Sequence, residues 1–324
     1  MSPDNTPLPP LPPYIIVFGP KANCTLDLCP VEYSVYGYRP SLAANVTFIA
    51  LYSLAVVIHA YLGVRWKQWW FMGCVVVGGL NAIIGYIGRC LLYLNPFNFV
   101  AFMIQIICIN SSPVYYCAAI YFTLSTTITH LSPHLSRFRP NLFYYIFIPC
   151  DLFSLVLQGA GGALSVASSG TSQIGVNLAL VGLSFQVFTI CLFCGFFGDY
   201  LIRYYQLSPQ QRHREARTKT HGIMGMGRMK LYFGFMGTAI ILTVARCAYR
   251  LAEMHAGYTG DGSSMIRDEG LFIGLEGVLI LAAVYCLLVG HPGLVFGRGD
   301  EKESLDGHEL IGTSTETDKA DGRR

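Results

Sequence analysis

An all-α membrane protein, built as a bundle of seven transmembrane helices, is the fold that this sequence predicts. Hydrophobic residues make up 53% of the 324 residues and charged residues only 13%, whereas a soluble domain carries about 25% charged residues. Seven apolar runs are each long enough to cross a hydrocarbon layer of about 30 Å. We expect the spans at residues 42–64, 69–94, 99–130, 141–167, 174–205, 229–256 and 270–290.

The segment before the first span, residues 1–41, is predicted to be an extracellular tail. Its proline-rich stretch, Pro7 to Pro13, cannot pack as a regular element. Cys24 and Cys29 are its two cysteines, and on the oxidising outer side they form either a small disulfide loop, which we favour, or two free thiols. Asn23 begins a glycosylation sequon. No signal-peptide pattern precedes the first span, so we expect that span to direct its own export.

The second and third spans carry polar groups inside apolar helices. Arg89 lies near the outer end of the second span. The third span contains Asn110, Ser111 and Ser112 directly before Pro113, and a proline inside a helix removes a backbone hydrogen bond and usually kinks the helix. These residues form either a polar structural kink that packs against neighbouring helices or part of the lining of a cavity.

The fourth span carries a carboxylate deep in the membrane. It starts near Asn141 on the cytoplasmic side, so Asp151 lies about 15 Å further along the helix, close to the bilayer midplane. Gln158 is seven residues further on, two turns away on the same face. The small residues at 159–162 permit close helix approach. In the fifth span we expect Gln186 to form a hydrogen bond between helices.

The sixth and seventh spans carry the remaining charges. Arg246, Arg250 and Glu253 are spaced i, i+4 and i+7, which places them in one stripe along the sixth span. Glu276 lies one to two turns into the seventh span, which starts on the outside near Glu269. Apart from the aspartate of the fourth span, all the charged residues in the spans are therefore expected in the outer half of the membrane.

Unpaired charges of this kind are too costly to face lipid. Each of the six costs about 3 kcal/mol at the bilayer centre, and together they approach 18 kcal/mol, above the ~5–15 kcal/mol by which a folded protein is usually stable. They must point into the bundle, where they form either salt bridges that set the helix register or a polar site for a substrate. We expect Arg246 and Arg250 to contact a carboxylate of the fourth or seventh span or a cavity.

Basic residues in the short loops predict the orientation. The first, third and fifth connections hold Arg65, Lys67, Arg137, Arg139, Arg212, Arg214, Arg217, Lys219 and Arg228, whereas the others hold only Arg267. Because Lys and Arg are enriched in cytoplasmic loops, the N-terminus is expected outside and the C-terminus in the cytoplasm. We interpret the basic fifth loop as an anchor of this topology, not as a nucleic-acid site. Residues 42–292 form the transmembrane domain, and 293–324 a disordered cytoplasmic tail.

Signatures of catalysis and cofactor binding are missing from the sequence. There is no phosphate-binding loop and no nucleophile elbow. His130 and His134 have helical metal-ligand spacing, but Pro133 lies between them and no third ligand is evident. We therefore expect neither an enzyme nor a metal or cofactor site.

Short motifs along the chain resemble a known family. They are Tyr38-Arg39-Pro40 with Asn45, Gly85-Tyr86 with Arg89, Pro113 with Ala118, Ala119 and Tyr121, and Asp151 with Gln158, Gly161 and Gly162. The most specific is the sixth-span run from Arg246 to Glu253. In this order they resemble the fungal lipid-translocating exporter family, seven-span proteins that include aminocholesterol-resistance and molasses-resistance proteins and a sphingoid-base exporter. In the seventh span, Glu276 replaces the usual Asp, and Ile273 with Gly274 replaces an aromatic stretch.

The resemblance implies a plasma-membrane protein that moves amphipathic lipids, sphingoid base- or sterol-like, or lipid-like toxins outward and so contributes to tolerance. Asp151, Glu253 or Glu276 would pair with an amine, and Arg89, Arg246 and Arg250 would pair with a phosphate or balance the acids. The alternative is a receptor-like sensor of lipids or stress that transports nothing. The expected partners are membrane lipids or amphipathic small molecules, and protein partners stay open.

Overall fold

The computed structural model describes residues 14–131, 139–167, 173–206, 226–259 and 268–293. The proline-rich stretch, the basic fifth loop at 207–225, the C-terminal tail from residue 294, His134 and the side chain of His130 lie outside this description. All secondary structure in the described part of the chain is helical. Seven of its helices are long and apolar enough to cross a membrane, so the chain is a multi-pass membrane protein with the predicted spans.

The spans begin and end within a few residues of the predicted positions. A short 3-10 helix, η1, precedes them at Val31–Tyr33. The spans are α1 (Leu42–Arg65), α2 (Trp69–Leu94), α3 (Phe99–Leu131), α4 (Asn141–Ala167), α5 (Gln173–Gln206) and α7 (Met226–Thr259). The seventh span is composite: α9 (Glu269–Leu271) leads into the π-helix η3 (Phe272–Val278), which continues as α10 (Leu279–Val289).

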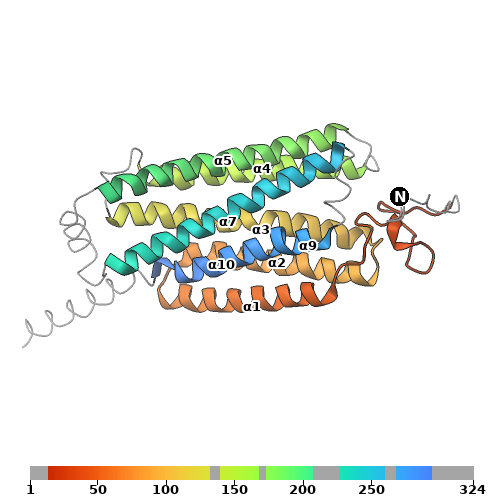
Figure 1. The fold of residues 1–324 in the computed structure, drawn as a ribbon, viewed down its shortest axis with the longest axis horizontal. Helices are drawn as coiled ribbons and strands as arrows, with labels where there is room; N and C mark the ends of the chain where they lie inside the picture. The colour runs from red at the N-terminus through yellow and green to blue at the C-terminus, as the bar shows by residue number, and fades with distance from the viewer. Residues whose placement is uncertain (1–13, 132–138, 168–172, 207–225, 260–267, 294–324) are drawn as a thin grey trace, which may run out of the picture.

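The helices lie side by side along the long axis of the molecule (Figure 1). Helix α2 packs between α1 and α3, whereas α4 and α5 form a pair on the other side of the bundle. Helix α7 crosses the bundle obliquely and contacts both α5 and the seventh span. The seventh span also contacts α1. Residues from α2, α3, α7 and the seventh span can therefore meet in the interior.

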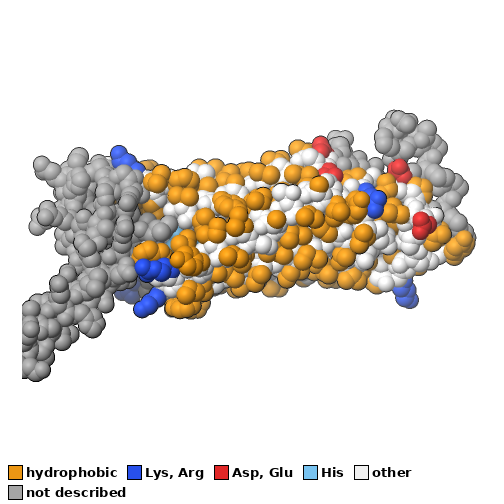
Figure 2. All heavy atoms as spheres, turned by 90° about the horizontal axis from the view of Figure 1, so that it is seen from below, with side chains coloured by type: hydrophobic (Ala, Val, Ile, Leu, Met, Phe, Trp, Pro, Cys, Tyr) orange, Lys and Arg blue, Asp and Glu red, His pale blue; other side chains and the backbone are white. Residues whose placement is uncertain are grey.

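The outer surface of the bundle is apolar over most of its length (Figure 2). Large hydrophobic side chains that would be buried in a soluble protein are exposed here, such as Val57 and Tyr61 on α1 and Phe153 and Val156 on α4. In the face that Figure 2 shows, charged side chains lie toward the two ends. This surface is suited to hydrocarbon chains, so the polar groups that matter for function must be sought in the interior.

The N-terminal segment, residues 14–41, packs on one end of the bundle. The disulfide between Cys24 and Cys29 is buried together with Phe97, which lies between α2 and α3. The ring of Phe18 meets those of Phe99 and Phe102 edge-on, each at 5.5 Å between centroids. The Asn23 side chain accepts a hydrogen bond of 2.8 Å from the backbone N–H of Ile16. The predicted tail is thus, over these residues, a folded cover on the helix ends.

Candidate functional site

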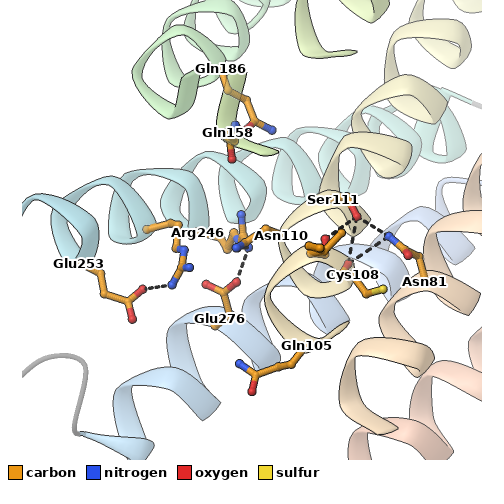
Figure 3. A network of polar contacts seen from close by, with 12 residues as sticks. Asn81, Gln105, Cys108, Asn110, Ser111, Gln158, Gln186, Arg246, Glu253 and Glu276 are labelled. Carbon is orange, nitrogen blue, oxygen red and sulfur yellow. Dashed lines mark hydrogen bonds and ion pairs between the residues drawn. The ribbon is translucent and has the colours of Figure 1, made fainter. Parts of the chain in front are cut away.

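A buried ion pair between α7 and the seventh span lies at the centre of the polar network (Figure 3). Nη2 of Arg246 contacts Oε1 of Glu276, and both side chains are only 1% exposed. The same nitrogen donates a hydrogen bond of 3.0 Å to Oδ1 of Asn110 on α3. The predicted contact of the sixth-span stripe with a carboxylate of another span is therefore confirmed for Arg246.

Glu276 is presented by the π-helix η3. π-Helical turns are rare and occur frequently at functional sites, and this one also contains Ile273 and Gly274, where the sequence departs from the family pattern. Gly277 allows η3 to approach α1 closely, because a Cβ atom there would lie 2.5 Å from the ring of Phe48. Phe48 in turn stacks on Tyr86 of α2, with 4.8 Å between the ring centroids. Aromatic packing on α1 and α2 thus holds the π-helix, and with it the carboxylate.

The space beside this ion pair is small. Tyr52, Tyr86 and Ser112 line it together with the ion pair, and it has room for about one water molecule. Oε2 of Glu276 and Nε of Arg246 have no hydrogen-bond partner among the described residues. A water molecule fits this arrangement, whereas a lipid headgroup would require the helices to move apart.

Arg250 and Glu253 form a second ion pair further along α7. Nη1 of Arg250 lies 2.6 Å from Oε2 of Glu253, and the two side chains are 16% and 8% exposed. Their i, i+3 spacing brings them together on one face of the helix. Arg250 therefore pairs with a carboxylate of its own helix and does not bridge to the fourth or seventh span as Arg246 does.

Arg89 connects the second span to the N-terminal segment and to the seventh span. Its Nη2 donates a hydrogen bond of 3.1 Å to the hydroxyl of Tyr38 and lies 3.8 Å from Oε1 of Glu269. The guanidinium carbon is 3.7 Å from the ring centroid of Phe272, a cation–π contact. Nε and Nη1 of this buried arginine have no hydrogen-bond partner in the described part of the chain. Two donor nitrogens of Arg89, which together carry three N–H groups, thus have no partner among the described residues.

Tyr36 forms a further contact between the N-terminal segment and the bundle. Its hydroxyl accepts a hydrogen bond of 2.7 Å from Nε2 of Gln105 on α3. Burial raises the pKa of Tyr36 to about 12, against an opposing effect of the nearby Arg89, so the phenol stays neutral at physiological pH. The N-terminal segment therefore covers Arg89 with the hydroxyl of Tyr38 and with the ring of Tyr36, whose centroid lies 5.5 Å from the guanidinium carbon.

The residues before Pro113 point in different directions, although α3 runs unbroken through this position. Asn110 faces α7, as described above. Ser111 accepts a hydrogen bond of 2.6 Å from Nδ2 of Asn81 on α2, and Ser112 donates one of 2.8 Å to the carbonyl of Gly78. The two serines thus join α3 to α2, whereas Asn110 belongs to the polar network and Ser112 also lines the small cavity.

Asp151 lies apart from the arginines. It is 2% exposed and accepts hydrogen bonds from the hydroxyl of Tyr121 on α3, at 2.9 Å, and from Oγ1 of Thr189 on α5, at 3.1 Å. No Lys or Arg of the described residues forms an ion pair with it. Of the two alternatives expected for the charges within the spans, Asp151 therefore does not fit the salt bridge, because the described residues that bind its carboxylate are neutral donors.

A second polar contact continues from Asp151 along the contact between α4 and α5. Nε2 of Gln158 donates a hydrogen bond of 2.9 Å to Oε1 of Gln186, so the predicted interhelical role of Gln186 is confirmed. Thr189 follows Gln186 by three residues and lies on the same helix face. We refer to Asp151, Gln158, Gln186 and Thr189 as the α4–α5 seam.

Several contributors to these sites were missed by the sequence reasoning, among them Tyr36, Asn81, Thr189 and Glu269. Thr189 binds the buried aspartate, and its spacing from Gln186 in an otherwise apolar run was a signal that could have identified it. Glu269 contacts Arg89, but only the folded chain brings the second and seventh spans together. Within the described residues no group of three or more His, Cys, Asp or Glu side chains is placed to hold a metal ion.

Comparisons with known proteins place this arrangement in context. The family model described as RTA1-like protein matches residues 75–299, a stretch that contains every charged residue of the interior named above. The sphingoid long-chain base transporter RSB1 of Saccharomyces cerevisiae is 28% identical over 313 residues, which cover 88% of this chain and 81% of the relative. A lipid-translocating exporter-like protein RTA1 of Leptosphaeria maculans is 26% identical over 298 residues, covering 84% and 53%. Protoporphyrin uptake protein 1 of Saccharomyces cerevisiae is 25% identical over 210 residues, covering 51% and 64%.

No solved structure matches the chain.

Proposed function

Because the chain belongs to the RTA1-like protein family, we propose that it moves amphipathic lipids with a cationic headgroup, such as sphingoid bases or sterol-like amines, or lipid-like toxins, outward across the plasma membrane. Seven membrane-spanning helices and relatives named as a long-chain base transporter and a lipid-translocating exporter support this assignment. Tolerance of such amphiphiles would be the consequence in the cell.

The observation that carries the proposal is the lone carboxylate of Asp151. A charge in the apolar part of a membrane protein needs compensation, and two hydroxyl groups supply hydrogen bonds but no positive charge. The ammonium group of a long-chain base supplies that charge. The carboxylates of Glu253 and Glu276, by contrast, already have an arginine each. Asp151 is therefore the contact that we assign to the amine.

The lipid-facing side of α4, at the level of the buried Asp151, suits the rest of such a molecule. Leu152, Phe153 and Val156, on the same stretch of α4, are more than half exposed on the apolar outer surface, where they can contact an alkyl chain. The α4–α5 seam offers the amide groups of Gln158 and Gln186 as further hydrogen-bonding partners for a headgroup. In this proposal the headgroup moves along the α4–α5 seam while the alkyl chain of the substrate stays in lipid. The side chains of Arg89, Arg246 and Arg250 bind hydroxyl or phosphate groups of the substrate.

Transport by purified protein in lipid vesicles tests the function directly. We expect the wild type to move a long-chain base across the bilayer. Asp151→Asn retains the size of the side chain and one acceptor oxygen, and its amide nitrogen can donate to a hydroxyl that turns round. Because the charge is removed, movement of the base should fall by about tenfold or more, equivalent to losing at least roughly 1.4 kcal/mol of binding. Transport of an N-acetylated analogue, which carries no charge, should proceed at the same rate in the wild type and in Asp151→Asn.

A matched control is available on the neighbouring helix. Asp199 of α5 is 37% exposed and lies 3.1 Å from Arg203, so Asp199→Asn removes a carboxylate outside the seam and should leave transport unchanged. Thermal unfolding of each variant in detergent separates a local effect from misfolding. If well-folded wild-type protein binds the base but moves none of it, the receptor-like sensor is the correct interpretation. If Asp151→Asn transports the base as fast as the wild type does, the assignment of Asp151 as the amine contact is wrong.

A further inference from the structure

The guanidinium group of Arg89 lies beneath the N-terminal segment with few hydrogen bonds. Arg89 is 0% exposed. Of its five N–H groups, only one, on Nη2, donates to a described residue, the hydroxyl of Tyr38. The carboxylate of Glu269 lies 3.8 Å from Nη2, beyond hydrogen-bonding distance. A buried charged donor without an acceptor is costly, so this arginine is suited to an acceptor from outside the chain.

A second arginine lies near the same place. Burial raises the pKa of Tyr36, and the charges of Arg89 and Arg250 oppose this rise, so both guanidinium groups lie near the Tyr36 hydroxyl. Nε of Arg250 has no hydrogen-bond partner among the described residues, and neither has Oε1 of Gln105, whose amide nitrogen donates to Tyr36. Two guanidinium groups and an amide thus surround a neutral hydroxyl group.

The charge balance of this cluster narrows the class of ligand. Glu253 lies 2.6 Å from Arg250 and Glu269 lies beside Arg89, so two carboxylates accompany the two arginines. Arginine is the residue of choice for phosphate, because two of its N–H groups can bind two phosphate oxygens at once. A simple anion would also meet both carboxylates. A headgroup with an ammonium group beside its phosphate instead offers the arginines an anion and the carboxylates a cation.

Two tyrosines of the N-terminal segment occupy the place that such a headgroup needs. Tyr36 and Tyr38 both contact Arg89 and remain partly exposed, so they form the outer layer over it. Gly37 between them has a φ of +69°, which glycine adopts without strain. We propose that Arg89 and Arg250 form a binding site for the phosphate of a zwitterionic amphiphile. Tyr36 and Tyr38 compete with that ligand for the site.

This site rests on the proposed function in taking an amphiphile as the ligand, and it adds regulation by the chain itself. Residues 34–41 must move off the bundle before the headgroup enters, so the measured affinity is reduced by the fraction of molecules in which the tyrosines cover the site. Binding can be measured without transport. If the protein moves no lipid but binds a phosphorylated amphiphile through Arg89, only the proposed transport fails.

Calorimetric titration of the full-length protein in detergent with a phosphorylated long-chain base tests the site. Arg89→Gln should lower the affinity for this probe at least about tenfold, and should leave the affinity for the unphosphorylated base unchanged. Equal affinity of the wild type and of a folded Arg89→Gln protein for the phosphorylated base would overturn the site, whether or not the protein transports the unphosphorylated base.

Two competitors identify the source of the phosphate. Inorganic phosphate has neither an ammonium group nor an alkyl chain and should not displace the phosphorylated base; displacement at equal concentration would overturn the zwitterionic ligand. Phosphatidylethanolamine carries both charged groups, and displacement by it would support the site and identify a bilayer phospholipid as its ligand.

Tyr38→Phe tests the competition by the N-terminal segment. The variant retains the ring but removes the hydroxyl that binds Arg89, so the covered state loses a hydrogen bond and the affinity for the phosphorylated base should rise about three- to tenfold. Tyr14→Phe, at a side chain that is 73% exposed, is the control and should not change it. Because Tyr38→Phe leaves both arginines in place, it also decides the question if Arg89→Gln does not fold. An unchanged or lower affinity of Tyr38→Phe would overturn the proposal.

Amide hydrogen exchange provides an independent measurement of the movement. Saturation with the phosphorylated base should make exchange at residues 34–41 faster, because the tyrosines then leave the bundle, whereas the unphosphorylated base should not affect it. Unchanged or slower exchange in the complex would show that the segment does not leave the site, and the competition would be wrong.

Discussion

Arg246 and Glu276 illustrate, at the residue scale, why charged groups persist in an apolar interior. Both are withdrawn from water almost completely, and the ion pair together with Asn110 compensates for much of that loss. A buried pair of this kind adds little to stability compared with a well-packed apolar pair, whereas breaking it leaves one charge uncompensated. The same reasoning distinguishes Asp151, whose compensation by Tyr121 and Thr189 is incomplete.

We predict a strong asymmetry between single and double substitutions at this pair. Glu276→Gln leaves the Arg246 charge buried without its partner and should destabilise the folded protein by about 3 to 5 kcal/mol. The double variant Arg246→Met with Glu276→Gln removes both charges and should recover most of that loss. Unfolding in mixed micelles with increasing denaturing detergent measures the difference.

The pair of Arg203 and Asp199 on α5 provides the contrast. Both side chains are 37% exposed, and exposed ion pairs contribute about 0 to 1 kcal/mol. Arg203→Gln should therefore change the unfolding transition only slightly. Equal destabilisation by Arg203→Gln and Glu276→Gln would mean that burial does not govern the energetics of these pairs.

At the scale of whole elements, close packing of α4 on α5 determines whether the α4–α5 seam can form. A Cβ atom added to Gly161 would lie 2.5 Å from the carbonyl oxygen of Gly175 and from the backbone nitrogen of Ala179. Backbone atoms cannot move aside without shifting the helix. At the neighbouring Gly162 nothing lies within 4 Å of such an atom. Two adjacent glycines of one helix thus have different structural roles.

This difference gives a matched pair of substitutions. Gly161→Ala should push α4 away from α5 and destabilise the protein by about 1 to 3 kcal/mol, as overpacking does elsewhere. Gly162→Ala should be neutral or stabilising by up to about 1 kcal/mol, because alanine favours a helix more than glycine does. Thermal unfolding of both variants in the same detergent checks the prediction, which is wrong if the two melt alike.

At the scale of the whole molecule, the distribution of charge bears on the orientation in the membrane. Arg65, Lys67 and Arg139 lie at the loop ends opposite the N-terminal segment, and the acidic side chains visible in Figure 2 lie at the end that carries this segment. The positive-inside tendency then favours an external N-terminus and a cytoplasmic C-terminus. On the same basis we propose residues 1–41 as the external part, 42–292 as the transmembrane domain and 293–324 as the cytoplasmic part.

Accessibility in intact cells tests this orientation. A protease site or epitope inserted between residues 206 and 228 should be protected until the cells are made permeable, whereas one placed within residues 1–13 should be accessible from outside. Cleavage of the 206–228 insert in intact, viable cells would reverse the topology and would place the Arg89 network near the cytoplasm.

The sequence by itself determined the seven spans, because the thickness of the bilayer sets the length of each apolar run and the information is local. It also identified the side chains that had to be buried, and the i, i+3 relation of Arg250 and Glu253 follows from helix geometry alone. Only the tertiary structure decided their partners. Which face of one helix contacts which face of another depends on the packing of all seven helices. As a result, Arg246 forms an ion pair with Glu276, whereas Asp151 accepts hydrogen bonds from hydroxyl groups. The rings of His59 and His291 lie close together although they are far apart in the sequence. The π-helix around Glu276 and the packing of residues 14–41 have the same origin, since contacts between distant segments stabilise them.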